Sequence, residues 1–248
     1  MLFRRISAHV KEQNWTAVAL DFAIVVVGVF VGIQVANFND ARREAETRAA
    51  LRLELAEDLK ADLAEIEGHI SFSAYRFAAA EALVGRVTGW QLPDAFPAEF
   101  GTTVPLARPG QAWPEEAADA LFFSQRYTTF DVERRVYDTL VATGELDITD
   151  DRQLVEDLRA YYLFAQNWRN TEDTTFRNTH DRLRARFKEN GLTFYEQVSW
   201  EALDGLVAED LELTGLLKST AYDASIQVAT MEDFQDIVSD LLARLQAE

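Results

Sequence analysis

Residues 15–38 read WTAVALDFAIVVVGVFVGIQVANF, a run of 24 residues in which Asp21 is the single charge. A helix of this length is about 36 Å long, which exceeds the roughly 30 Å hydrocarbon core of a bilayer. Trp15 and Phe38 stand at its two ends, where aromatic side chains are typical interface anchors. A cleavable signal peptide and a buried core helix are the alternatives. Because Gln34 fits the −3 position of a cleavage site poorly, the sequence predicts a retained transmembrane helix.

One face of this predicted helix combines an acid with two glycines. At about 100° per residue, a single stripe contains Asp21, Val25, Gly28, Gly32 and Val35. The Gly28-x-x-x-Gly32 spacing lets two helix backbones approach closely, and a carboxyl group at this depth is costly unless it is paired, protonated or hydrated. The stripe predicts contact with another helix, from a second copy or from a membrane partner protein. The alternative is that Asp21 reaches interfacial water.

Basic residues flank the predicted helix on both sides. They are Arg4, Arg5 and Lys11 in the short N-terminal arm 1–14, and Arg42, Arg43, Arg48 and Arg52 beyond Phe38. We expect Arg42 and Arg43 to be interface anchors. The two sets are nearly equal in number; we expect the arm to be cytoplasmic and the large C-terminal domain to lie outside the cytoplasm.

All prolines of the chain lie in one short region. They are Pro93, Pro97, Pro105, Pro109 and Pro114, and Gly89, Gly101 and Gly110 lie among them. Proline interrupts helix interiors, so residues 89–115 are predicted to form one long irregular loop.

The rest of residues 39–248 shows helical periodicity. The first apolar stripe has one seven-residue step, after Ile70; its members are Leu55, Leu59, Leu63, Ile66, Ile70, Phe77, Ala80, Val84 and Val87. Further helices are expected over 117–127, over 131–143 with Gly144 as C-cap, over 150–190, and from Ser199 to the end with a break near Gly205 or Gly215. The predicted fold class is all-α: the transmembrane helix continues into an antiparallel helical bundle.

The net charge of −18 belongs entirely to this helical domain. Residues 1–40 carry three basic and three acidic side chains, whereas residues 41–248 carry 21 basic and 39 acidic ones. Nucleic-acid binding requires clustered Lys and Arg, so this class of function is excluded. The absence of cysteine excludes disulfides, thiolate metal sites and a cysteine nucleophile.

Few side chains have a pattern that is typical of catalysis. The three histidines belong to different segments and lack helical metal-ligand spacing, and the common hydrolase, P-loop and dinucleotide motifs are missing. His180-Asp181 is an isolated pair. An acidic cluster resembles a solvated helix face or a loose divalent-cation site; it comprises Glu54, Glu57, Asp58, Asp62, Glu65 and Glu67. We therefore predict no catalytic, cofactor or metal residues.

Aromatic residues are concentrated between residues 161 and 200, and most are expected to fill the core. Tyr161 and Tyr162 are adjacent and point about 100° apart on a helix, so at least one of them has access to a surface or pocket. Some of these rings are thus candidates for lining a ligand site.

Two stretches resemble a bacterial family of single-pass membrane proteins whose shared domain has no assigned function. The first is Asp21 followed by IVVVGVFVGIQVANFND and Arg42-Arg43, similar to that family's acid-led anchor with an Asn-rich exit. The second runs from Tyr137-Asp138-Thr139-Leu140 through Gly144-Glu145-Leu146 and on to Leu154, Leu158, Tyr161 and Tyr162, similar to its Y-x-x-L-x-x-x-G-x-L helix-and-turn motif. The chain departs from the pattern by aspartate at position 21, phenylalanine at position 38 and a less basic arm. The resemblance implies an inner-membrane helical protein and brings no catalytic residues.

The leading hypothesis is a non-enzymatic, membrane-anchored sensor or scaffold that binds a partner or ligand. Its expected partners are the lipid bilayer and a second copy or a membrane protein. The alternative is an accessory subunit of a membrane transport or energy-coupling complex, with Asp21 as a functional carboxylate. An enzyme in the loop region, with Trp90, Trp113, Glu115 and Glu116, is the third hypothesis.

Overall fold

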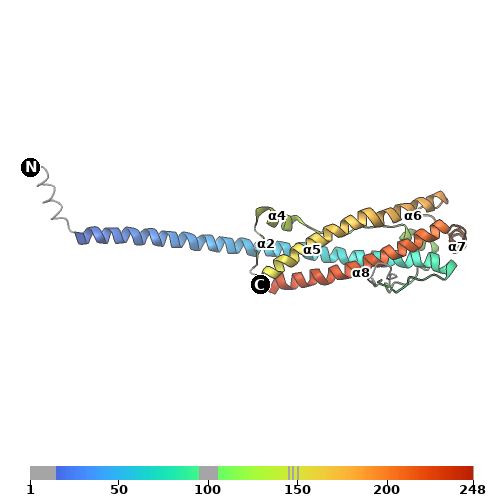
Figure 1. The fold of residues 1–248 in the computed structure, drawn as a ribbon, viewed down its shortest axis with the longest axis horizontal. Coiled ribbons are helices and arrows are strands. Elements are labelled where there is room, and N and C mark those ends of the chain that lie inside the picture. The colour runs from blue at the N-terminus through green and yellow to red at the C-terminus, as the bar shows by residue number, and fades with distance from the viewer. Residues whose placement is uncertain (1–14, 95–105, 145, 147, 150, 248) are drawn as a thin grey trace, which may run out of the picture. The chain divides into compact units, whose positions relative to one another are not determined.

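The computed structural model describes residues 15–94, 106–144, 146, 148–149 and 151–247, with side chains from Ala19 onward. Within these ranges the chain is all-α and contains no strand, which confirms the predicted fold class (Figure 1). The helices are α2 (Trp15–Thr88), α3 (Ala117–Ser124), α4 (Arg135–Thr143), α5 (Arg152–Thr171), α6 (Arg177–Glu189), α7 (Trp200–Glu209) and α8 (Leu211–Ala247). A π-helical turn, η2 (Glu172–Phe176), joins α5 to α6.

The chain divides into two compact units, residues 1–51 and 52–248, which we describe separately. In the first unit every large apolar side chain from Leu20 to Phe38 is exposed. Ion pairs between residues four apart, Arg42 with Glu46 and Arg48 with Glu44, follow on the same helix. The described part of α2, Ala19–Thr88, is long and apolar enough to cross a membrane.

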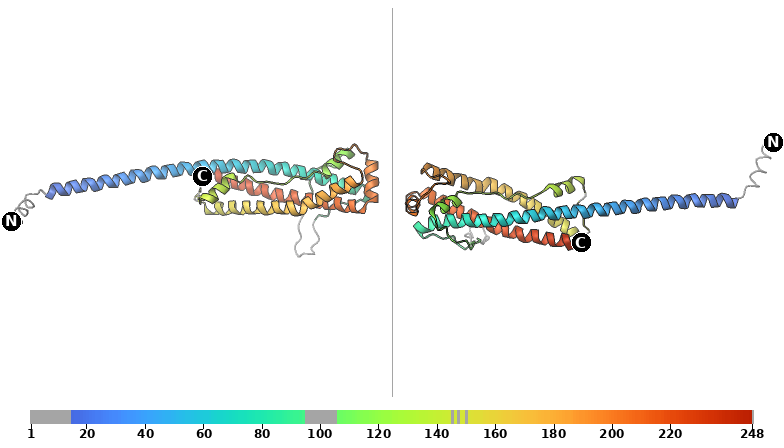
Figure 2. Two further views of the ribbon diagram at one scale, coloured as in Figure 1. Left: turned by 90° about the horizontal axis from the view of Figure 1, so that it is seen from above. Right: turned by 180° about the vertical axis from the view of Figure 1, so that it is seen from behind.

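In the second unit, α8 runs antiparallel to both α2 and α5. The contacts fix these directions: Asp62 and His69 of α2 meet Tyr161 and Glu172 in the same order along the chain. On α8 the order is reversed, because Gln227 contacts Glu172 and Phe234 contacts Tyr161. The return from the end of α2 to the start of α5 is made by α3, an extended segment and α4 (Figure 2).

Local signals account for most helix ends. Gly89 and Gly144 have φ values of 69° and 73°, the left-handed conformation that suits glycine, and Gly144 caps α4 as expected. The Asp151 and Ser199 side chains accept backbone N–H groups at the starts of α5 and α7.

The break in the last helical region is at Asp210, so the prediction of a break near Gly205 or Gly215 is wrong. Asp210 accepts the Leu213 N–H at 3.0 Å and thereby caps α8. Its other carboxylate oxygen accepts Arg186 Nε at 2.6 Å, which holds the pKa of Asp210 near 2. A buried cap that is fixed by an arginine thus ends α7, while both glycines lie inside helices.

The described parts of the predicted loop, residues 89–94 and 106–115, contain no helix and pack against α2 and α8; residues 95–105 lie outside the described ranges. Glu81 accepts the Leu92 N–H at 3.0 Å and the indole Trp113 Nε1–H at 3.2 Å. The Trp113 ring lies so close to Gly85 that a Cβ there would be 3.0 Å from it. Ser225 of α8 donates to Ala107 O at 2.7 Å. These residues serve packing, which offers no support for an enzyme site around Trp113.

Candidate functional site

The most unusual element of the second unit is the segment between α3 and α4, residues 125–134. Helix was predicted from Asp131, but α4 begins only at Arg135. The first two N–H groups of the segment, those of Gln125 and Arg126, still donate to the last turn of α3, but several later ones donate to carboxylates on flanking helices. Phe130 N–H donates to Glu172 Oε2 at 2.8 Å, and Glu133 N–H donates to Asp62 Oδ1 at 2.8 Å.

Two further bonds complete this arrangement. Asp131 N–H donates to Glu65 Oε1 at 3.2 Å, and Val136 N–H donates to Asp58 Oδ2 at 3.3 Å. Buried backbone donors need partners, and no strand lies beside this segment. Carboxylates therefore take the place of a neighbouring strand, which is the physical reason that 131–134 is not helical.

The predicted solvated face is consequently wrong for two of its six acids. Asp58 and Asp62 are buried, and Asp62 is only 1% exposed, whereas Glu54, Glu57, Glu65 and Glu67 lie at the surface. Burial raises the pKa of Asp62 to about 6, although bonds from Glu133 N–H and Tyr161 favour its charged form. No group of three or more His, Asp or Glu side chains in the described ranges is placed to hold a metal ion.

Glu172, the first residue of the π-helical turn, is the centre of the buried polar contacts. Its side chain is fully buried; Oε1 accepts Gln227 Nε2 at 2.9 Å and lies 3.3 Å from His69 Nε2. Its backbone carbonyl accepts the Tyr127 hydroxyl at 2.8 Å. Burial, with Glu172 nearby, raises the pKa of Tyr127. π-helical turns are frequent at functional sites, and this one places Glu172 among the buried polar side chains.

A second group of buried polar atoms adjoins Glu172 on α2 and α8. Arg76 is 3% exposed, and burial lowers its pKa while Asp223 and Glu172 favour its charge. Burial raises the pKa of Asp223 to about 6, against the effects of Arg76 and a hydrogen bond with Thr179. Several atoms here lack a hydrogen-bond partner among the described residues: His69 Nε2, Ser73 Oγ, Arg76 Nε, Asp223 Oδ2 and Gln227 Oε1.

We call this set the polar centre: His69, Ser73, Arg76, Glu172, Asp223 and Gln227. An apolar cluster that includes Phe77, Leu121 and Leu217 lies on one side of it, and an aromatic cluster with Phe130, Tyr161 and Phe234 lies on the other. These six residues were not predicted from the sequence to form a group. The signal of the polar centre was the seven-residue step between Ile70 and Phe77, because Ser73 occupies the position where an apolar residue is expected.

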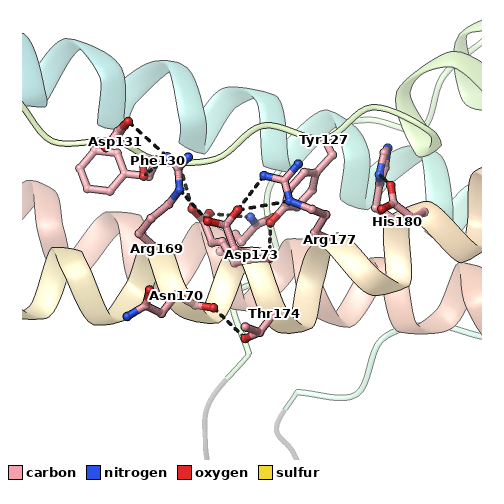
Figure 3. A network of polar contacts seen from close by, with 12 residues as sticks. Tyr127, Phe130, Asp131, Arg169, Asn170, Asp173, Thr174, Arg177 and His180 are labelled. Carbon is pink, nitrogen blue, oxygen red and sulfur yellow. Dashed lines mark hydrogen bonds and ion pairs between the residues drawn. The ribbon is translucent and has the colours of Figure 1, made fainter.

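On the outer side of the π-helical turn, charged residues form a ladder (Figure 3). Asp173 accepts Arg169 Nε at 3.1 Å and an Arg177 guanidinium nitrogen at 2.7 Å, and Arg177 lowers the pKa of Asp173 most. Arg169 also reaches Phe130 O at 3.4 Å. Each of these exposed pairs contributes little to stability. Together they connect side chains of α5 and α6 across the π-helical turn.

Both ring nitrogens of His180 contact oxygen atoms of the protein. Its Nε2 is 2.8 Å from Gln125 O and its Nδ1 is 3.1 Å from Asp181 Oδ1. Burial lowers the pKa of His180, while the contacts with Gln125 O and Asp181 act against this effect. The contact with Gln125 O ties α6 to the start of the extended segment.

The surface feature best suited to binding is a groove between α5 and α8. Its volume is about 540 Å³, and its lining residues are Asp157, Ala160, Tyr161, Phe164, Asp236, Ile237, Asp240 and Leu241. Phe164 and Ile237 are 42% and 37% exposed, although both are large and apolar. The volume is in the range of ligand pockets.

Tyr161 connects this groove to α2. Its ring is part of the groove lining, and its hydroxyl donates to Asp62 Oδ2 at 2.7 Å. Tyr162 is also buried and stacks on Tyr137, with ring centroids 4.0 Å apart. Of the two adjacent tyrosines, Tyr161 is therefore the one that borders a pocket, as the sequence allowed for one of them.

Arg244 closes one end of the groove. Its guanidinium lies 2.6 Å from Asp157, 3.0 Å from Asp151 and 3.3 Å from Asp240. Arg244 lowers the pKa of Asp157 and of Asp151, so both stay ionised at neutral pH. Asp236 has no ion-pair partner within the described part of the chain.

The predicted anchor stripe lies in the first unit, where all its members are exposed: Asp21, Val25, Gly28, Gly32 and Val35. A Cβ at either glycine would have no atom within 4 Å. Phe38, Arg42 and Arg43 are exposed as well, and the side chain of Trp15 lies outside the described set. Helix contact and interface anchoring by these residues stay predictions.

In comparisons with family models, curated proteins and solved structures, no match to the chain was found. The resemblance to the bacterial membrane family therefore stays a prediction.

Proposed function

We propose that this chain is a single-pass, membrane-anchored and non-catalytic helical module that binds a partner through the groove between α5 and α8. The observation that carries the proposal is the groove itself, because large apolar side chains stay exposed there beside carboxylates. Contiguous exposed apolar surface on a soluble domain is typical of an interaction site. The charged ladder and His180, by contrast, are accounted for by packing.

The proposed anchor is residues 15–38. Exposed valine, isoleucine and phenylalanine side chains over this stretch support insertion in lipid, where the backbone bonds of a helix are internally satisfied. We place it in the inner membrane of a bacterium, as a member of the family it resembles, with the C-terminal domain outside the cytoplasm. The stripe with Gly28 and Gly32 is proposed to contact a second copy or a membrane partner.

A route from the groove to the anchor-bearing helix supports a sensing role. The Tyr161 ring lies in the wall of the groove, and its buried hydroxyl donates to Asp62 on α2. Asp62 also accepts Glu133 N–H, so the same carboxylate contributes to the position of the extended segment. A partner that shifts this wall of the groove would act on α2 through the Tyr161–Asp62 hydrogen bond.

Site-directed photo-crosslinking of the full chain in cell membranes tests this function. The photoreactive residue p-benzoylphenylalanine is placed at Ile237 in the groove, and at Ala208 on α7 as a matched exposed control. We expect a discrete adduct at Ile237 that is missing at Ala208 and is lost when Ala160→Trp fills the groove. Equal labelling at both positions, or none, would contradict the proposal. Extraction at alkaline pH tests the anchor, which should keep the chain in the membrane pellet.

A further inference from the structure

We infer that the groove takes a basic amphipathic helix of a partner protein. This inference rests on the proposed function and adds the chemical class of the partner. Three properties of the groove carry it: the spacing of its lining residues, the charge of its rim, and the nature of its exposed apolar side chains.

The lining residues follow helical spacing on both walls. On α5, Asp157, Tyr161 and Phe164 are separated by four and three residues and cover about two turns, or roughly 10 Å. On α8, Ile237 and Leu241 are four residues apart. Grooves between two helices with such spacing accept a third helix, which inserts side chains at i, i+3 or i+4, and i+7.

The rim of the groove is acidic. Asp157, Asp236 and Asp240 border it, and Arg244 is the basic residue in contact with two of them. On the same part of α8, Glu232 and Asp233 are exposed as well. The excess of carboxylates favours lysine and arginine in the partner, because complementary charge steers association and selects partners.

The same charge argues against other occupants. A second copy of this domain, with 39 acidic and 21 basic residues over 41–248, would be repelled from the rim. An anionic lipid surface would be repelled for the same reason. A neutral apolar ligand would satisfy Phe164 and Ile237 but leave the unpaired carboxylate of Asp236 without a function.

Disulfide trapping tests the inference with a defined probe. The natural chain has no cysteine, so Ala160→Cys places one thiol in the groove of the full chain, and Ala208→Cys places one on α7. The probe is an amidated peptide of about 18 residues with leucines at i, i+3, i+4 and i+7, lysines elsewhere and one cysteine on its leucine face. That cysteine is activated as its disulfide with thionitrobenzoate, so the protein thiol forms the mixed disulfide by exchange and thionitrobenzoate is the leaving group. A second peptide has glutamate in place of lysine.

We expect the lysine peptide to form about tenfold more mixed disulfide at position 160 than at 208, and more than the glutamate peptide does at 160. Asp236→Lys with Asp240→Lys should lower trapping about tenfold, whereas Glu201→Lys with Glu209→Lys, the same charge change on α7, should leave it within about twofold. Thermal unfolding of each variant shows whether it is folded.

Equal trapping of both peptides at position 160, or no dependence on the Asp236 and Asp240 charges, overturns the basic partner. Trapping at 208 equal to that at 160 overturns the groove as its site. If photo-crosslinking at Ile237 still gives its discrete adduct, the proposed binding function stands and only the partner class is wrong.

Discussion

The Tyr161 hydroxyl lies 2.7 Å from Asp62 Oδ2, while the neighbouring Tyr162 hydroxyl is buried without a hydrogen-bond partner among the described residues. The two rings are both 1% exposed and adjacent in sequence, so they form an internal comparison. One hydroxyl stabilises a buried carboxylate on α2; the other is a desolvated group with nothing to offset its burial.

Tyr161→Phe and Tyr162→Phe should therefore change the free energy of unfolding by different amounts or in opposite directions. Removing the Tyr161 hydroxyl leaves Asp62 with one donor fewer, and we expect the free energy of unfolding to fall by about 1–3 kcal/mol at pH 8. Removing the Tyr162 hydroxyl should be neutral or stabilising. Urea unfolding of the full chain in neutral detergent measures both. Equal losses in the two variants would mean that the Asp62 bond contributes nothing specific.

The stability of the domain should rise as the pH falls from 8 to 5. Burial raises the pKa values of Asp62 and Asp223 from 3.8 to about 6, so the folded state binds protons that the unfolded state does not bind. The stability that their protonation contributes is fully present below about pH 4 and is lost as the pH rises through 6. Each group contributes on the order of 2 kcal/mol over this interval.

His180 acts in the opposite direction, because burial lowers its pKa and the unfolded state protonates first below pH 6.5. Asp210, with a pKa near 2, does not titrate in this range. Asp62→Asn and Asp223→Asn should each flatten the dependence of unfolding free energy on pH between 5 and 8. A dependence that is unchanged in both variants would contradict the assignment to these two carboxyl groups.

Glu172 should contribute far more to the free energy of unfolding than its neighbour Asp173. Glu172→Ala leaves the donors Phe130 N–H and Gln227 Nε2 buried without their acceptor, at a cost of about 3–5 kcal/mol. Asp173→Ala breaks exposed ion pairs and should change the free energy of unfolding little. Thermal unfolding measures both losses, and hydrogen exchange should show faster exchange of the Phe130 amide in Glu172→Ala only.

Local patterns in the sequence predict the helices well, because periodicity, caps and proline act over a few residues. Gly144 ends α4 for such a reason. The extended segment could not be found in this way: Phe130 and Glu133 leave the helix because Glu172 and Asp62, 42 and 71 residues away, accept their N–H groups. The burial of Asp58 and Asp62 follows from the same distant contacts, so their sequence pattern resembled a solvated face.

The break at Asp210 has the same origin, since Arg186, 24 residues away, fixes the capping carboxylate. The groove was also beyond prediction, because its two walls, around Tyr161 and Ile237, come from helices that are distant in sequence. The sequence named Tyr161 and Tyr162 together as adjacent rings that point in different directions and did not distinguish between them.

Two glycines inside helices, Gly215 in α8 and Gly85 in α2, test this distinction between local and distant effects. Gly215 lies inside α8, where an added Cβ meets no atom within 4 Å, so Gly215→Ala should stabilise the domain by about 0.5–1 kcal/mol. Gly85→Ala should destabilise it, because its Cβ would be 3.0 Å from the Trp113 ring and from Trp90 O. Thermal unfolding of the two variants checks the signs; a stabilising Gly85→Ala would show that the Trp113 contact is not maintained.

The anchor stripe gives the last prediction, which separates a packing role from a functional carboxylate. If Gly28 and Gly32 mediate close helix contact, Gly28→Leu with Gly32→Leu should abolish crosslinked oligomers in membranes, whereas Val26→Leu, about 140° around the helix from Asp21, should not. Asp21→Asn keeps the side-chain shape and removes the charge. Retained assembly with lost biological activity would favour the accessory-subunit hypothesis; retained assembly and activity would leave Asp21 a structural residue; oligomers that persist in the double glycine variant would exclude the stripe as the contact surface.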